Sequence, residues 1–156
     1  MEPIRLGKNM QVRDLMTNNP ACCTPDTPLK EVAHMMMRCD CGEIPIVDSR
    51  DSMRPIGVIT DRDIIIRAVA SAQNPLEMSA SDCMTQPCIT VSKDASIVDC
   101  IHLLEEHQIR RIVAVDKNGK CCGIVSQADV ARRVDTYAAE VLKQVSQPAE
   151  THQRPR

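Results

Sequence analysis

Two short segments of this 156-residue chain carry side chains suited to binding a phosphorylated sugar. In each, a glycine is followed three positions later by a hydroxyl residue and three positions after that by an aspartate: Gly57, Thr60 and Asp63, then Gly123, Ser126 and Asp129. A hydroxyl at a helix start caps it, and the free N–H groups there attract an anion such as phosphate. A carboxylate one turn on can accept hydrogen bonds from the vicinal hydroxyls of a ribose. Together with aliphatic walls, these groups would suit an adenosine.

The same spacing also has an explanation that needs no ligand. Thr60 and Ser126 can be ordinary helix caps, and Asp63 and Asp129 can complete a capping box at the third helical position. The recurrence of the spacing in matching contexts favours binding, and both interpretations stay open at the level of sequence.

The elements that position these residues belong to an internal repeat. The segment 14–17 returns as 82–85, and after the loop that follows Asp48 the offset between the copies falls from 68 to 66 positions. A duplicated unit predicts two similar halves with a cleft between them. The other recurring residues are Asp26, Ile44, Val47 and Asp48, which return as Asp94, Ile112, Val115 and Asp116.

Apolar periodicity and turn residues predict the same order of elements in both copies. Each copy begins with a short helical turn and an extended piece, continues with a helix and two β-branched strands, and ends with a second helix after Thr60 or Ser126. The order is β-α-β-β-α, twice, which predicts a mixed α/β layer structure. The expected limits are a first unit at 10–70, a linker at 71–78, a second unit at 79–135, a helical extension at 136–145 and a flexible tail at 146–156.

Composition narrows the class of protein. Apolar residues make up 43% of the chain, enough to fill a core, but Tyr137 is the only aromatic residue. Without aromatic platforms, and with a net charge of −2, nucleic acid is not an expected partner. No apolar run approaches the roughly 20 residues that span a bilayer, and residues 1–10 lack a secretory signal. We therefore expect a cytoplasmic protein that does not bind membranes.

The nine cysteines are an odd number without an export signal, which is typical of reduced thiols used as small buried side chains. Cys39 and Cys41 are closely spaced but lack the usual zinc-ligand spacings, so no metal site is expected. A thiol- or metal-responsive sensor stays an alternative function. No nucleophile is paired with a base in the sequence, and the chain is not expected to be an enzyme.

In combination, the repeated motifs resemble a tandem pair of cystathionine-β-synthase (CBS) domains, a Bateman module, over about residues 10–135. The resemblance implies two β-α-β-β-α units related by pseudo-two-fold symmetry and packed sheet to sheet. It also implies adenosyl ligands in the clefts between them and a homodimer of pairs. The stand-alone architecture is similar to small bacterial stress- or hypoxia-response CBS proteins. The matching pieces are 14–17 with 82–85, 44–48 with 112–116, and the two Gly-x-x-Thr/Ser-x-x-Asp segments.

The function that this resemblance implies is regulatory and non-catalytic. Such pairs bind AMP, ADP or ATP, and in other members NAD or S-adenosylmethionine, and report the occupancy to a downstream protein that the sequence does not identify. No cofactor is required. The alternative is a ligand-free protein-interaction or structural stress-response protein.

The resemblance also implies roles for individual residues. Asp63 and Asp129 correspond to ribose-binding residues, and Thr60 and Ser126 to residues at the phosphate or ribose edge. Arg110 and Arg111 stand where energy-sensing members carry basic residues facing phosphate, a task that suits guanidinium groups, although a solvated strand start explains them equally well. Adenine contacts correspond to Ile44, Pro45, Ile46 and Thr24 in one copy and to Ile112, Val113, Ala114 and Thr90 in the other.

The two copies differ where a phosphate would lie. Gly42 and Glu43 take the place of Arg110 and Arg111, and a carboxylate beside a phosphate is repulsive. We therefore expect two unequal sites, with the phosphate-binding one built around Arg110, Arg111 and Asp129.

Overall fold

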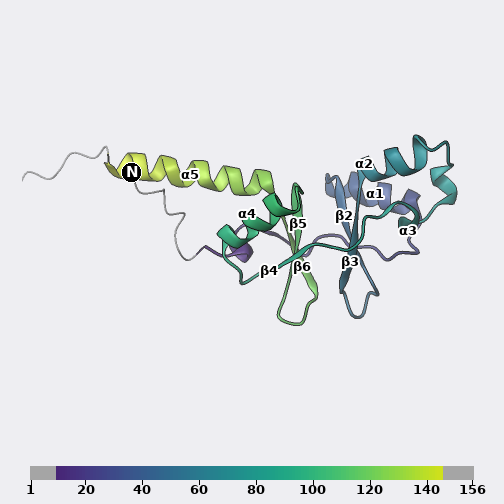
Figure 1. The fold of residues 1–156 in the computed structure, drawn as a ribbon, viewed down its shortest axis with the longest axis horizontal. Helices are drawn as coiled ribbons and strands as arrows, with labels where there is room; N and C mark the ends of the chain where they lie inside the picture. Colours follow the sequence, from purple (N-terminus) through teal and green to yellow (C-terminus); the bar gives the residue numbers. More distant parts are fainter. Residues whose placement is uncertain (1–9, 146–156) are drawn as a thin grey trace, which may run out of the picture.

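The computed structural model describes residues 10–145 (Figure 1). Its elements follow the order expected from the repeat. The first copy comprises the 3-10 turn η1 (Val12–Asp14), β1 (Thr17–Asn18), α1 (Leu29–Cys39), β2 (Glu43–Val47), β3 (Pro55–Thr60), α2 (Asp61–Ile64) and the π-helical η2 (Ile65–Val69). The expected linker contains the 3-10 turn η3 (Pro75–Glu77). The second copy comprises α3 (Ala80–Cys83), β4 (Thr90–Ser92), α4 (Ile97–Glu106), β5 (Arg111–Val115), β6 (Cys121–Ser126) and α5 (Gln127–Val145).

The strands form two small sheets built around equivalent hairpins. Strands β2 and β3 pair antiparallel, and β5 pairs with β6 in the same way within a four-stranded sheet of order β1-β6-β5-β4. The register shifts at the same place in both hairpins, between Ile46 and Val47 and between Ala114 and Val115. The expected mixed α/β fold of two related units is confirmed.

The helices bury one face each, as their periodicity predicts, with one difference. In α1 the buried side chains are Leu29, Val32 and Met35, whereas Met37, expected on the same face, is 72% exposed. Met37 is five residues on from Val32, the middle one of the three buried side chains, and at about 100° per residue it is rotated by about 140° from it. The buried face of α4 contains Ile97, Cys100 and Leu104, in agreement with the pattern.

The opening segment of each copy packs against the other copy's unit. We call these two segments, residues 12–18 and 80–85, the exchanged turns. In the N-terminal segment, the Val12 N–H donates to the Ala95 carbonyl at 2.9 Å, and β1 pairs with β6. Conversely, the Ala80 N–H donates to the Thr27 carbonyl at 2.8 Å. The two hydrophobic cores follow this exchange, because Val12 is buried with the core of the second unit and Ala80 and Cys83 with that of the first. The repeat in the sequence and the packed units in space are therefore offset.

The two sheets face each other in the middle of the molecule, with the helices outside (Figure 1). Val47, Val113 and Cys121 form the buried cluster between them, and partly buried side chains such as Met53 and Cys88 pack against it. The Cys121 N–H donates to the Met53 carbonyl at 2.8 Å across this junction. The sheet-to-sheet packing implied by the resemblance is present.

The last described element, α5, is one continuous helix that projects beyond α4 (Figure 1). It includes the expected extension at 136–145, while the expected tail at 146–156 lies outside the described residues. Among residues 10–145, no helix combines the length and apolar character needed to cross a bilayer.

Candidate functional site

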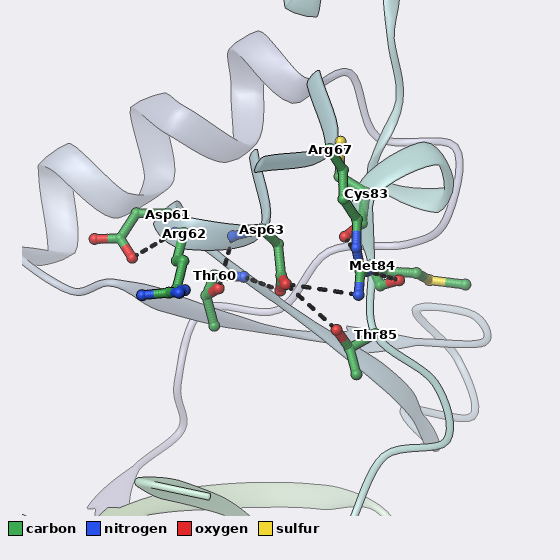
Figure 2. Close-up of polar contacts among 8 residues, drawn as sticks. All are labelled: Thr60, Asp61, Arg62, Asp63, Arg67, Cys83, Met84 and Thr85. Atoms are coloured by element: carbon green, nitrogen blue, oxygen red, sulfur yellow. Dashed lines mark hydrogen bonds and ion pairs between the residues drawn. The ribbon is translucent and has the colours of Figure 1, made fainter. Parts of the chain in front are cut away.

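Both Gly-x-x-Thr/Ser-x-x-Asp segments form capping boxes where a strand passes into a helix. The Thr60 N–H donates to Asp63 Oδ2 at 2.9 Å, and the Asp63 N–H donates back to Thr60 Oγ1 at 3.0 Å (Figure 2). In the second unit, the Ser126 N–H donates to Asp129 Oδ2 and the Asp129 N–H to Ser126 Oγ, each at 3.0 Å. One carboxylate oxygen of each aspartate is therefore engaged by its own helix start.

The second oxygen of each aspartate has a different neighbourhood. Asp63 Oδ1 accepts from the Thr85 hydroxyl at 3.4 Å and lies 3.9 Å from Arg67 Nη2 (Figure 2). Arg67 also donates to the carbonyls of Cys83 and Met84 at 2.7 and 2.6 Å, so it fastens the exchanged turn to the first unit.

Asp129 Oδ1 pairs with Arg132, one turn further along α5. Burial alone would raise the pKa of Asp129, but the hydrogen bonds from Ser126 and the Arg132 guanidinium outweigh it, and the pKa lies below its usual range. Asp129 is therefore ionised at neutral pH, as a ribose acceptor must be.

A cavity of about 280 Å³ lies between the units and contains Ser126 and Asp129. The second unit contributes these two residues, Arg111 and Ile124, and the exchanged segment adds Thr17. From the first unit come Pro20, Ala21, Ile44 and Glu43, together with the turn Cys39, Asp40 and Cys41. The cavity thus combines a helix start, carboxylates, one guanidinium and an aliphatic wall.

Glu43 and Arg111, which occupy equivalent positions of the two copies, meet in this cavity. Glu43 Oε2 is buried without a hydrogen-bond partner among the described residues. Burial raises the pKa of Glu43; the Arg111 guanidinium opposes that shift, and the nearby Asp63 carboxylate adds to it. The cavity carries Asp40, Glu43 and Asp129 against Arg111, which makes it more acidic than the sequence indicated.

The structure brings together only some of the residues expected to form a site. Ile44, Arg111, Ser126 and Asp129 share the cavity. Arg110 lies elsewhere, in a groove of about 530 Å³ between α4 and α5 that Gln127 and Val130 also line. The two adjacent arginines face different spaces because successive residues at a strand start point to opposite sides.

The remaining expected residues take structural positions. Ile46, Ile112, Val113 and Ala114 are at most 1% exposed, in the cores or between the sheets, and Pro45 is fully buried with them. Thr24 donates to Asp26 Oδ1 at 2.5 Å, and Thr90 pairs with Val113 in the parallel β4–β5 ladder.

Several cavity residues were not predicted from sequence. Thr17, Pro20 and Ala21 reach the cavity because the opening turn crosses to the second unit. Their only signal was the repeated motif that ends at Thr17 and Thr85. Asp40 lines the cavity from a left-handed turn after α1, at φ 48°.

The sequence profile of the CBS domain matches this chain twice, over residues 12–69 and 80–136. An uncharacterized protein of Methanopyrus kandleri is 36% identical over 132 residues, which are 85% of this chain, and the match spans 63% of that relative's length.

Two solved structures share the fold and more than a quarter of the aligned sequence. Hypoxic Response Protein I, crystallised with two coordinated zinc ions, has a TM-score of 0.69 and 31% identity, covering 79% of this chain and 98% of that one. A CBS domain protein of Pyrobaculum aerophilum, complexed with AMP, has a TM-score of 0.71 and 26% identity, covering 83% and 99%.

Proposed function

Because this chain belongs to the CBS domain family and contains a tandem pair of such domains, we propose that it is a non-catalytic regulatory module that binds an adenine nucleotide. The proposed site is the cavity between the units that contains Ser126, Asp129 and Arg111. The observation that carries the proposal is this combination of a capped helix start, a half-buried carboxylate and a guanidinium beside an aliphatic wall.

Each part of a nucleotide finds a matching group in the cavity. Ribose hydroxyls would donate to Asp129 Oδ1, the oxygen that the capping box leaves free and that now pairs with Arg132. Ile44, Ala21 and Ile124 offer aliphatic surface to the purine, and Arg111 offers a bidentate contact to phosphate. At about 280 Å³ the cavity is near the lower end of ordinary ligand pockets, about 300–1,000 Å³, so it suits one nucleotide.

The charges favour a ligand with few phosphates. Glu43 and Asp40 line the same cavity as Arg111, and each added phosphate brings further repulsion from these carboxylates. We therefore place AMP before ADP and ATP, with NAD and S-adenosylmethionine as further candidates. The AMP complex of the Pyrobaculum aerophilum relative supports this order.

The Thr60–Asp63 cap is the second and weaker candidate. Its free carboxylate oxygen faces Thr85, and its neighbour Arg67 is occupied by two backbone carbonyls. Binding there would have to compete with these contacts, which supports unequal occupancy of the two sites.

Calorimetric titration of the full chain with AMP, ADP, ATP, NAD and S-adenosylmethionine tests the proposal. We expect saturable binding of AMP that Asp129→Ala weakens strongly and Asp63→Ala weakens less. No heat with any of the five ligands, in a protein that unfolds cooperatively, would overturn it.

We further propose that the chain acts in the cytoplasm as a homodimer of CBS pairs and signals to a downstream protein. Three large apolar side chains are exposed on the first unit: Ile65 by 58%, Val69 by 59% and Leu76 by 70%. An exposed apolar surface can mark a protein–protein interface. Light scattering after size exclusion, with Val69→Lys as the variant, tests the dimer: the variant should run as a monomer if this surface is the interface.

Two other functions keep specific support. A ligand-free interaction protein is favoured by the capping boxes, which are complete without any ligand. A metal-responsive protein is suggested by the zinc ions of Hypoxic Response Protein I, although residues 10–145 contain no group of three or more side chains placed to hold a metal. Elemental analysis of the purified protein distinguishes the two, because only the metal-responsive protein should contain bound zinc.

A further inference from the structure

Two cysteines from different units meet at the junction of the sheets. The Sγ atoms of Cys22 and Cys121 are 3.6 Å apart, although the residues are 99 positions apart in the sequence. Cys22 precedes the core residue Cys23 in the first unit, and Cys121 begins β6 in the second. Neither side chain is needed for the nucleotide cavity, which Cys22 borders only through its neighbour Ala21.

The surrounding structure holds the two sulfur atoms in place. The Cys121 N–H is fixed to the Met53 carbonyl of the opposite unit at 2.8 Å, and its side chain is packed with Val47 and Val113. Cys22 is only partly buried, whereas Cys121 is buried. The pair therefore combines a fixed, buried thiol with a partly exposed one.

The hydrogen bond between the two thiols makes them chemically unequal. The Cys22 thiol donates to Cys121 Sγ, and the hydrogen bond between the two lowers the pKa of Cys22 against the opposing effect of burial; Arg50 also lowers it. The same bond and burial raise the pKa of Cys121. Cys22 is partly exposed whereas Cys121 is buried, so an oxidant from solvent meets Cys22 first. Because the thiolate is the reactive form, we assign Cys22 as the nucleophile of the pair and Cys121 as the resolving thiol.

We propose that Cys22 and Cys121 are a peroxide-oxidisable pair whose disulfide joins the two CBS units covalently. The Cys22 thiolate attacks one oxygen of hydrogen peroxide, the O–O bond breaks, and a sulfenic acid and hydroxide form; the hydroxide takes up the proton that the Cys22 thiol had released and becomes the first water. Cys121 then loses its proton and attacks the Cys22 sulfur, and the sulfenic oxygen leaves as a second water. Two thiols lose two electrons and two protons, peroxide becomes two waters, and the sulfur atoms close to about 2.05 Å.

Neighbouring thiols are less suited to this reaction. Burial raises the pKa of Cys88 to about 12, with the Cys121 and Glu43 charges acting in the same direction, so it stays protonated. Cys23 and Cys100 are buried in the two separate cores, where burial raises the pKa of each thiol to about 11. The proposal does not depend on nucleotide binding.

The test uses the full chain, reduced, freed of reductant and treated with hydrogen peroxide. Free thiols are then alkylated, and the protein is digested with trypsin and mapped by mass spectrometry. We expect peptide 14–30 linked to peptide 121–132, with two hydrogens lost. Because both peptides contain adjacent cysteines, fragmentation between Cys22 and Cys23 and between Cys121 and Cys122 assigns the link.

Thermal unfolding gives a second readout. A bond that closes a loop of about 100 residues should raise the Tm on the order of 10 °C, and a reductant should reverse the rise. Cys22→Ala and Cys121→Ala should abolish both the link and the shift, whereas the matched control Cys88→Ala should keep both.

The proposal fails if Cys22 and Cys121 stay alkylatable while other thiols oxidise, if Cys22 links to Cys88, or if the disulfides join two chains. The peptide map of the unmodified sequence decides this even where a variant does not fold.

Discussion

At the residue scale, one pair of equivalent positions makes the two halves of the cavity different. Glu43 and Arg111 arise from the same place in the repeat, yet one brings a buried carboxylate without a hydrogen-bond partner among the described residues and the other a guanidinium. An ionised carboxylate in that position lacks the solvation it has in water. The ionised Glu43 carboxylate therefore lowers the free energy of unfolding.

The pH dependence of Glu43→Gln tests this cost. A carboxyl whose pKa is higher in the folded chain favours folding below its unfolded pKa, near 4.5, and that contribution is lost as the pH rises through its raised folded pKa. At pH 7.5, Glu43→Gln should therefore stabilise the protein by about 1 kcal/mol. The gain should shrink below pH 4.5. Urea denaturation at both pH values measures it, and an equal gain at both would contradict the assignment.

Removing the charge of Arg111, the residue at the equivalent position of the second copy, is the control. Arg111 lowers the pKa of Glu43, so Arg111→Gln should raise that pKa further and destabilise the protein at pH 7.5. In the double variant with Glu43→Gln, the part of this destabilisation that acts through the Glu43 carboxylate should be absent.

Asp129→Asn separates the capping role of Asp129 from its proposed ligand role. The amide oxygen can still accept from the Ser126 N–H, so the free energy of unfolding should change by less than about 0.5 kcal/mol. The lost negative charge should weaken AMP binding about tenfold or more, since hydrogen bonds to charged groups contribute about 1.5–3 kcal/mol. Calorimetry and urea denaturation on one preparation give both numbers. An unchanged affinity would leave Asp129 as a cap alone.

For single residues, the sequence predicted which side chains are at the site better than it predicted where those side chains point. The hydroxyl and carboxylate pairs were found from their spacing, because a capping box is a local motif within one turn. Arg110 and Arg111 were expected to act together, and only Arg111 lines the cavity. The two side chains point into different spaces because of the position of β5 in its sheet, and that position cannot be inferred from two adjacent residues alone.

At the element scale, the two hairpins receive the exchanged turns at equivalent glycines. A Cβ on Gly57 would meet the Thr85 carbonyl oxygen at 2.7 Å, whereas a Cβ on Gly123 would meet the Met16 side chain, with Cγ at 2.9 Å. Thr85 is bonded in both directions to Val58, so its carbonyl is held. The Met16 thioether can turn to another rotamer.

Gly57→Ala should therefore cost about 1–3 kcal/mol of stability, and Gly123→Ala clearly less. Chemical denaturation of the two variants measures the difference. Equal losses would mean that Met16 is held as firmly as the backbone of Thr85.

The strands and long helices were predictable because their apolar patterns are local. The extended piece at 21–24 was not fully realised: Cys23 forms a single parallel bridge to Ile46, while the equivalent segment of the second copy forms the strand β4. The change from α-helix to π-helix after Ile64 has no signal in the residue types.

At the scale of the whole molecule, the offset between sequence repeat and packed unit decides which fragments can fold. The core of the first unit runs from Cys23 to Cys83 and includes Ala80. A fragment cut at the repeat boundary, residues 10–70, lacks that turn and retains Val12, whose core lies in the other unit.

A fragment of residues 20–87 should therefore unfold more cooperatively, and at a higher urea concentration, than residues 10–70. Circular dichroism across a urea titration compares them, and the full chain is the reference. If 10–70 proved the more stable, the exchanged turns would contribute little to either core.

The exchange also sets an order of events on the ribosome. Domains ordinarily fold as units while the chain is still being synthesised, the N-terminal one first. Here the first unit cannot complete its interior until the Ala80–Cys83 turn has left the exit tunnel. The segment around Val12 is translated before that core, yet it reaches its final position only after β6 has been made.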